Sequence, residues 1–106
     1  MRIIKLHVAL PKTTEAQTLG KQVLRSGTSV GAHYREGTRA RSTAEFVSKL
    51  GGAQQELEET AYWLELLGDS DIVKAALLQE LLKESDELGK ILTTCIKNAK
   101  EKATKA

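Results

Sequence analysis

Cysteine and proline are almost absent from this chain, each occurring once in 106 residues. The single cysteine, Cys95, excludes an intramolecular disulfide, and its neighbours Leu92 and Ile96 indicate a small buried hydrophobe rather than a reactive thiol. The N-terminus lacks the charged and then apolar pattern of a signal peptide, and no apolar run approaches the ~20 residues that cross a bilayer. We therefore expect a cytoplasmic protein with no membrane partner.

Aromatic residues make up only 4% of the chain, whereas apolar residues of all kinds make up 41% and charged residues 28%. This balance is typical of a folded globular protein rather than of a disordered one. The length allows one domain, and a helical domain of this size can bury a core without disulfides or metals. Residues 100–106 are mostly Lys, Ala and Glu, so we expect a frayed basic tail there.

The charges are distributed unevenly along the chain. Residues 1–50 carry nine Lys and Arg against three acids, a net charge of +6, and residues 51–106 carry seven Lys against eleven acids, a net charge of −4. The two halves together give the net charge of +2 of the whole chain. This asymmetry indicates either an anionic partner for the first half or charge pairing between the two halves.

The clearest helical pattern covers residues 42–67. Ser42 and Glu45 have the spacing of a capping box, in which the Ser42 hydroxyl accepts a hydrogen bond from the Glu45 N–H and Glu45 reaches back. Apolar residues then recur every three or four positions and form one stripe. Gly51 and Gly52 lie inside this stretch, either as a site of close helix approach or as a tolerated weakness.

A second strong pattern covers residues 72–99, where apolar residues recur with a period near 3.5 and form a stripe wide enough to contact more than one neighbour. Gly68 is expected to end the preceding helix. Asp69, Ser70 or Asp71 can then cap this one, because hydroxyls and acids suit the positive start of a helix.

Residues 14–39 form a third helical pattern, which opens with a second capping box that begins at Thr14. The segment Ser26–Gly31 lies in its middle, and helix propensity alone would break the helix there. The alternative is a continuous helix whose small residues let another backbone approach closely. Gly27 and Gly31 are four positions apart and would then share the packing face.

Residues 2–10 are ambiguous, since their alternating apolar residues fit a strand as well as a short helix. No second strand is available to pair with, and a lone strand is unstable, so we predict a short helix that ends before Pro11. Four helices with short connections predict an all-α protein with the architecture of an up-down-up-down four-helix bundle.

Three blocks of the sequence together resemble the four-helix bundle proteins encoded in intervening sequences of bacterial 23S rRNA genes. The blocks occur in the family's order and are Leu24–Glu36, Arg41–Leu50 and Glu58–Leu67. The resemblance covers roughly residues 2–90, and it implies that the segment Ser26–Gly31 lies inside a continuous second helix.

The same resemblance implies an assembly, because known structures of the family are homopentamers. We therefore expect this chain to form a ring-like homo-oligomer. A related branch is the accessory protein of diversity-generating retroelements, a basic pentamer that works with a reverse transcriptase and its RNA. The partners that the resemblance implies are thus other copies of the chain and either RNA or a reverse transcriptase.

Three arginines form the candidate nucleic-acid-binding site. Arg35 and Arg39 are four positions apart on the predicted second helix, and Arg41 follows closely. Arginine forks suit phosphate oxygens, so this group predicts contact with RNA and the role of a ribonucleoprotein accessory protein. A solvated face or a subunit interface would use the same residues. The alternative function is a protein-binding or structural oligomer, in which the positive half of one subunit meets the negative half of the next.

Two other groups are expected to serve the structure. If the second and third helices are antiparallel, Arg25 lies opposite Glu56 and Glu59, which predicts a structural ion pair. Tyr62 and Trp63 are adjacent, so their side chains point about 100° apart on a helix. At least one of the two is therefore expected at a subunit interface.

Sequence motifs of catalysis and ligand binding are missing. The segment Ser26–Gly31 lacks the Gly-Lys-Ser/Thr ending of a phosphate-binding loop, and His7 and His33 have no metal-ligand spacing between them. No Ser-His-Asp or Cys-His set is indicated. We therefore expect no enzymatic activity, no metal, no cofactor and no small-molecule substrate.

Overall fold

The computed structural model describes residues 2–105, which fold into four α-helices without a strand. The all-α fold class predicted from the sequence is therefore confirmed, and residues 2–9 form the helix rather than the strand of the two alternatives. The helices are α1 (Arg2–Ala9), α2 (Thr14–Thr38), α3 (Thr43–Asp69) and α4 (Ala75–Lys105).

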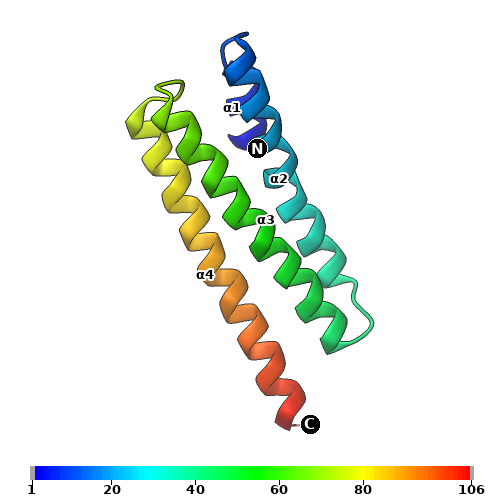
Figure 1. The fold of residues 1–106 in the computed structure, drawn as a ribbon. Coiled ribbons are helices and arrows are strands. Elements are labelled where there is room, and N and C mark those ends of the chain that lie inside the picture. The colour runs from blue at the N-terminus through cyan, green and yellow to red at the C-terminus, as the bar shows by residue number, and fades with distance from the viewer. Residues whose placement is uncertain (1, 106) are drawn as a thin grey trace.

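The three long helices lie lengthwise beside one another, with α3 in the middle (Figure 1). The chain reverses between α2 and α3 and again between α3 and α4, so the start of α2, the end of α3 and the start of α4 share one end of the molecule. The short α1 packs beside the first half of α2 only. The resulting shape is elongated, with extents of 53 × 21 × 18 Å.

Helix α2 runs without interruption through Ser26–Gly31, as the family resemblance implied. Its hydroxyl groups bond back to carbonyls of the preceding turn, since the Ser26 and Thr28 hydroxyls donate to the Gln22 and Leu24 carbonyls at 2.8 and 2.7 Å. These bonds keep short polar side chains compatible with a helix. Helix propensity alone fails here because the packing of Ser26 against α3 outweighs it.

The two predicted capping boxes have different outcomes. Ser42 caps α3, and its hydroxyl accepts from the Glu45 N–H at 3.1 Å, as expected. The Glu45 carboxylate reaches back to the Arg41 N–H at 3.5 Å rather than to that of Ser42. The cap of α2 is Thr13 rather than Thr14, because the Thr13 hydroxyl accepts from the Ala16 N–H at 3.2 Å. The prediction at this helix start was therefore wrong by one residue.

The predicted boundary between α3 and α4 was wrong. Helix α3 does not stop at Gly68 but continues to Asp69, and Ser70 is its C-cap. Asp69 and Ser70 therefore belong to the end of α3 and do not cap α4. Asp71 has a φ of 56° and donates its N–H to the Gly68 carbonyl, so it closes the turn after α3 instead of opening α4. Residues 72–74 connect the two helices, and Val73 of this connection is buried in the core. Helix α4 therefore begins at Ala75 rather than at position 72.

Helix α4 extends through Lys105. The sequence predicted a frayed tail over residues 100–106, but residues 100–105 continue the helix. Residue 106 lies outside the described residues. Lys, Ala and Glu are strong helix formers, and the Thr104 hydroxyl bonds back to the Lys100 carbonyl at 2.9 Å. The composition that suggested fraying therefore supports the helix.

The core has two parts along the length of the molecule. The first cluster lies at the α1 end and includes α1 itself, whereas the second lies toward the α2–α3 loop and is built from α2, α3 and α4 alone. The first cluster comprises Leu6, Leu10, Ala16, Val23, Leu64, Leu67, Val73 and Leu81. The second comprises Val30, Leu50, Ala53, Leu57 and Leu92. The second half of the molecule therefore has one helix fewer around its core.

Candidate functional site

The three arginines predicted to contact nucleic acid lie at one end of the molecule, where α2 ends and α3 begins. Arg35 is in the last turn of α2, Arg39 is its C-cap, and Arg41 lies in the connecting loop. All three are exposed, and none of their guanidinium groups pairs with an acidic side chain among residues 2–105.

The last turns of α4 bring further cations to the same end, because α4 is helical through Lys105 (Figure 1). Arg41 and Lys102 line one hollow of about 550 Å³, together with Phe46. We call this end the basic pole and define it by Arg35, Arg39, Arg41, Lys97, Lys100 and Lys102. Sequence reasoning missed Lys100 and Lys102 because it treated residues 100–106 as frayed, although their run of helix-forming residues was a usable signal.

The acid that follows Arg35 in the sequence is paired with a lysine. Glu36 accepts a hydrogen bond from Lys49 Nζ at 2.9 Å, which ties the end of α2 to the start of α3. This hydrogen bond and the charge of Lys49 lower the pKa of Glu36, and the same contact raises the pKa of Lys49. Both side chains stay ionised near neutral pH, and Glu36 adds little negative charge to the basic pole.

Arg25 lies away from the basic pole and opposite Glu56 and Glu59, as the sequence predicted. Its Nη1 is 3.3 Å from Glu56 Oε2, its Nη2 pairs with Glu59, and its Nε donates to Gln22 Oε1 at 3.0 Å. The structure thus brings all three members of the expected ion pair together between α2 and α3. With its guanidinium occupied in this way, Arg25 serves helix pairing rather than the candidate site.

The glycines expected to pack together behave differently. A Cβ at Gly27 would lie 3.0 Å from Ile3 Cγ2, so α1 approaches α2 closely at this residue. At Gly31, no atom lies within 4 Å of the Cβ position, so the predicted close approach does not occur there. On α3, Gly52 packs closely against the ring of His33, whereas Gly51 also faces open space.

Tyr62 and Trp63 form an edge-to-face pair, with ring centroids 5.0 Å apart and an interplanar angle of 63°. Trp63 packs against the first core cluster, and its indole N–H donates to Glu59 Oε1 at 3.1 Å. Tyr62 is exposed on the outer side of α3. Of the two residues predicted for a subunit interface, only Tyr62 is therefore placed on an open surface.

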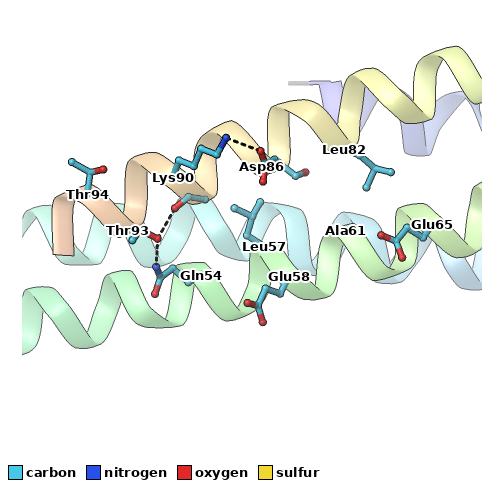
Figure 2. Close-up of a pocket in the computed structure, with 12 residues that line it drawn as sticks. Gln54, Leu57, Glu58, Ala61, Glu65, Leu82, Asp86, Lys90, Thr93 and Thr94 are labelled. Atoms are coloured by element: carbon cyan, nitrogen blue, oxygen red, sulfur yellow. Dashed lines mark hydrogen bonds and ion pairs between the residues drawn. The ribbon is translucent and has the colours of Figure 1, made fainter. Parts of the chain in front are cut away.

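A groove of about 910 Å³ runs between α3 and α4, and sequence reasoning missed it (Figure 2). Glu58 and Glu65 line its α3 side, and Asp86 lines its α4 side, where it pairs with Lys90 at 3.2 Å. A hydrogen bond of 2.9 Å between Gln54 and Thr93 joins the two helices. The groove therefore presents a mainly acidic rim at a distance from the basic pole.

The described residues contain no group of three or more His, Cys, Asp or Glu side chains placed to hold a metal ion. Within residues 2–105, no helix combines the length and the apolarity needed to cross a membrane. The fold and its surface thus define a helical protein with one basic end.

The family model of the 23S rRNA-intervening sequence proteins matches residues 1–94, and the chain belongs to this family. The chain is also similar to a solved structure from Bacteroides thetaiotaomicron VPI-5482, described as a protein of unknown function from the S23 ribosomal protein family. The two chains are 40% identical, the match covers 91% of this chain and 86% of the other, and the TM-score is 0.86. None of the curated proteins compared with the chain matches it.

Proposed function

We propose that this chain is a non-enzymatic accessory protein that binds RNA through the basic pole. The observation that carries the proposal is the gathering of cations from two segments that are far apart in the sequence, the α2–α3 junction and the end of α4. The guanidinium groups of the exposed arginines there have no acidic partner among residues 2–105. Free guanidinium groups suit the phosphates of a folded RNA.

The family description gives this proposal its biological setting. Proteins of this family are described by their link to 23S rRNA intervening sequences, which makes structured RNA the natural anionic partner to test. Cations outnumber aromatic side chains at the basic pole, where the aromatic ones are the half-buried Phe46 and Tyr34, which directly precedes Arg35. We therefore expect it to contact the phosphate backbone rather than to stack on bases, and to bind with little preference for sequence.

Charge reversal at the pole tests the proposal. The variant Arg39→Glu/Arg41→Glu should lower the affinity for a labelled RNA hairpin at least tenfold, measured by fluorescence anisotropy, because it removes two phosphate contacts and adds repulsion. The matched control is Lys12→Glu/Lys74→Glu, which makes the same change in net charge at exposed sites at the opposite end. Equal losses in both variants would show that only net charge matters, and the pole would then not be the binding site.

A structural homo-oligomer is the second candidate function, and the groove between α3 and α4 favours it. Its acidic rim, with Glu58 and Glu65, is complementary to the basic surface that Arg35 and Arg39 form on α2. A contact between two different surfaces of one chain is head-to-tail, and it closes into a ring where the rotation between subunits allows. The pentamer is the ring that the family resemblance implies.

Sedimentation velocity separates the two candidates. In the structural oligomer, Glu58→Lys/Glu65→Lys dissociates the assembly, and Arg35→Glu/Arg39→Glu does the same. Mixing the two variants restores association between unlike subunits, because the reversed surface of one then fits the reversed groove of the other. Since only unlike subunits fit, the mixed assemblies alternate and are open or even-numbered rather than pentameric. If both variants sediment as the unaltered protein does, the basic residues are free for RNA and the structural candidate is excluded.

A further inference from the structure

His33 lies on the face of α2 that packs against α3, about one and a half turns before the end of the helix. Its ring rests on Gly52, since a Cβ there would lie 3.1 Å from both Nδ1 and Cε1. The side chain is 34% exposed, but its Nδ1 atom is buried and has no hydrogen-bond partner among residues 2–105. Folded proteins rarely leave a buried polar atom unpaired. The neighbouring charges give this one a role.

The carboxylate of Glu36 faces the unpaired nitrogen. Its Oε2 lies 3.9 Å from His33 Nδ1 and 2.9 Å from Lys49 Nζ, so one oxygen stands between two basic groups. A neutral imidazole that presents a lone pair at Nδ1 cannot bond to this oxygen, because both atoms are acceptors. Protonation places an N–H at Nδ1, and a movement of the exposed Glu36 side chain by about 1 Å then forms a charge-assisted hydrogen bond.

The other charged groups around His33 are engaged or point elsewhere. On the facing helix, Glu56 is held by an arginine of α2 at 3.3 Å, and Glu45 accepts from a backbone N–H of the α2–α3 loop at 3.5 Å. On α2 itself, Arg35 is two positions after His33 and therefore points to the opposite side of the helix. These groups leave Glu36 as the acid that faces the imidazole.

We propose that His33 is a proton-dependent switch of the basic pole, which binds RNA more tightly when this imidazole is charged. The inference rests on the proposed function and adds a regulation of the same site. When His33 is neutral, the charges of Glu36 and Lys49 cancel. When His33 is protonated, it shares the carboxylate with Lys49, and the three groups together carry one positive charge.

The added charge lies close enough to the basic pole to act on it. His33 is six residues before Arg39, which corresponds to about 9 Å along α2, and charges interact over about 10 Å at 0.1 M salt. Lys49 also gains freedom to turn toward a phosphate, because it no longer has Glu36 to itself.

The switch operates in the pH range in which histidine side chains change their charge, between about pH 5 and 8. Glu36 is ionised throughout most of this range, because the hydrogen bond and the charge of Lys49 lower its pKa. Proton uptake and RNA binding are then linked, so RNA favours the charged imidazole by the same factor by which the proton favours RNA.

The chain contains two histidines, which makes a selective test possible. Binding of a labelled RNA hairpin is measured by fluorescence anisotropy at low salt between about pH 7.5 and 5.5. The affinity of the unaltered protein should rise roughly threefold or more as the pH falls. His33→Asn keeps a polar side chain that cannot be charged, so this rise should be lost. The control His7→Asn removes the histidine of α1, which lies away from the basic pole, and should keep the rise.

Glu36→Gln gives a second readout. It removes the partner of Lys49 and the carboxylate that faces His33, so RNA binding at neutral pH should be tighter and nearly independent of pH. Glu15→Gln is the matched control, because it makes the same change in net charge at an exposed residue near the start of α2. Its affinity and its pH dependence should stay close to those of the unaltered protein.

NMR separates this inference from RNA binding itself. Without RNA, the carboxyl signal of Glu36 should shift as histidine titrates in the unaltered protein and should not do so in His33→Asn. Absence of this shift in the unaltered protein would overturn the switch even if the basic pole binds RNA.

Two binding results would also overturn the switch. One is an equal rise in affinity on acidification in His33→Asn and the unaltered protein, and the other is a rise that His7→Asn abolishes instead. Absence of RNA binding at every pH would overturn the proposed function and its regulation together, whereas binding that does not respond to pH would overturn the regulation alone.

Discussion

The hydroxyl oxygens of Ser26 and Thr60 lie 2.8 Å apart, and both residues are buried, with 0% and 2% of their surface exposed. This pair joins α2 to α3 at the junction of the two core clusters. Each hydroxyl also has a carbonyl of its own helix 2.8 Å away, Gln22 O for Ser26 and Glu56 O for Thr60, so the single Thr60 proton is shared between the Glu56 carbonyl and the Ser26 hydroxyl. A polar pair that is satisfied in this way fixes the register of the two helices at little cost.

We expect Ser26→Ala and Thr60→Val each to lower the free energy of unfolding by about 1 kcal/mol, because the hydroxyl that remains keeps its bond to a backbone carbonyl. The double variant should cost less than the sum, with a coupling energy of about 0.5–1 kcal/mol, as expected for residues in contact. Urea unfolding measures all three values. Thr28→Ala is the control, since its hydroxyl bonds only within α2, and a control loss as large as that of Ser26→Ala would contradict the role of the pair.

Two glycines of α2 should respond to alanine with opposite signs. Gly31→Ala should raise the free energy of unfolding by about 0.5–1 kcal/mol, because the site is open and the unfolded chain loses freedom. Gly37→Ala should lower it by about 1–3 kcal/mol, because the new methyl group meets Leu50, which is fully buried and has no room to move. Thermal unfolding of the two variants, which differ only in position, checks the packing around each glycine, and a shift of the same sign in both would contradict it.

The ion pair between Glu36 and Lys49 makes a prediction about pH. The pKa of the Glu36 carboxyl is lower in the folded protein than in the unfolded chain. The pair therefore stabilises the folded protein above the pKa of the unfolded carboxyl, and this stabilisation is lost as the pH falls through the folded pKa. In Lys49→Gln, the pKa of Glu36 should return toward its ordinary value, because the hydrogen bond and the positive charge that lower it are gone. An NMR titration of the Glu36 carboxyl measures this shift directly. An unchanged pKa in Lys49→Gln would show that the pair is not formed in solution.

The sequence was informative where a local pattern and the packing agree. The Ser42 cap, the stripes of α3 and α4 and the placement of Arg25 opposite Glu56 and Glu59 all follow from helical periodicity and an antiparallel pairing. Continuity of α2 through Ser26–Gly31 could not be deduced from propensity, because it depends on the buried contact with Thr60.

The extended basic pole was also beyond the sequence. It depends on where helices end relative to one another, since α4 is long enough to bring Lys102 beside Arg41. Helix ends are the weakest part of a sequence-based prediction, because capping and tertiary packing compete for the same residues. The early end of α3 expected at Gly68 failed for this reason.

The lysines of α4 should also contribute to RNA binding, although less than the arginines do. We expect Lys100→Glu/Lys102→Glu to weaken binding of an RNA hairpin at least fivefold, because α4 carries both side chains to the basic pole. Circular dichroism should show unchanged helix content, since glutamate also favours helices. Unchanged RNA affinity in this variant would restrict the binding surface to the α2–α3 junction.

The salt dependence of RNA binding tests the central claim most directly. Fluorescence anisotropy of a labelled RNA hairpin is measured between low and moderate salt, and the logarithm of the binding constant is plotted against the logarithm of the salt concentration. Three or more phosphate contacts at the basic pole predict a slope of about −2 to −3 or steeper, and this slope should become shallower by about 2 in Arg39→Glu/Arg41→Glu. Absence of binding even at low salt, or a slope that the variant leaves unchanged, would contradict the account of the basic pole as an RNA-binding surface.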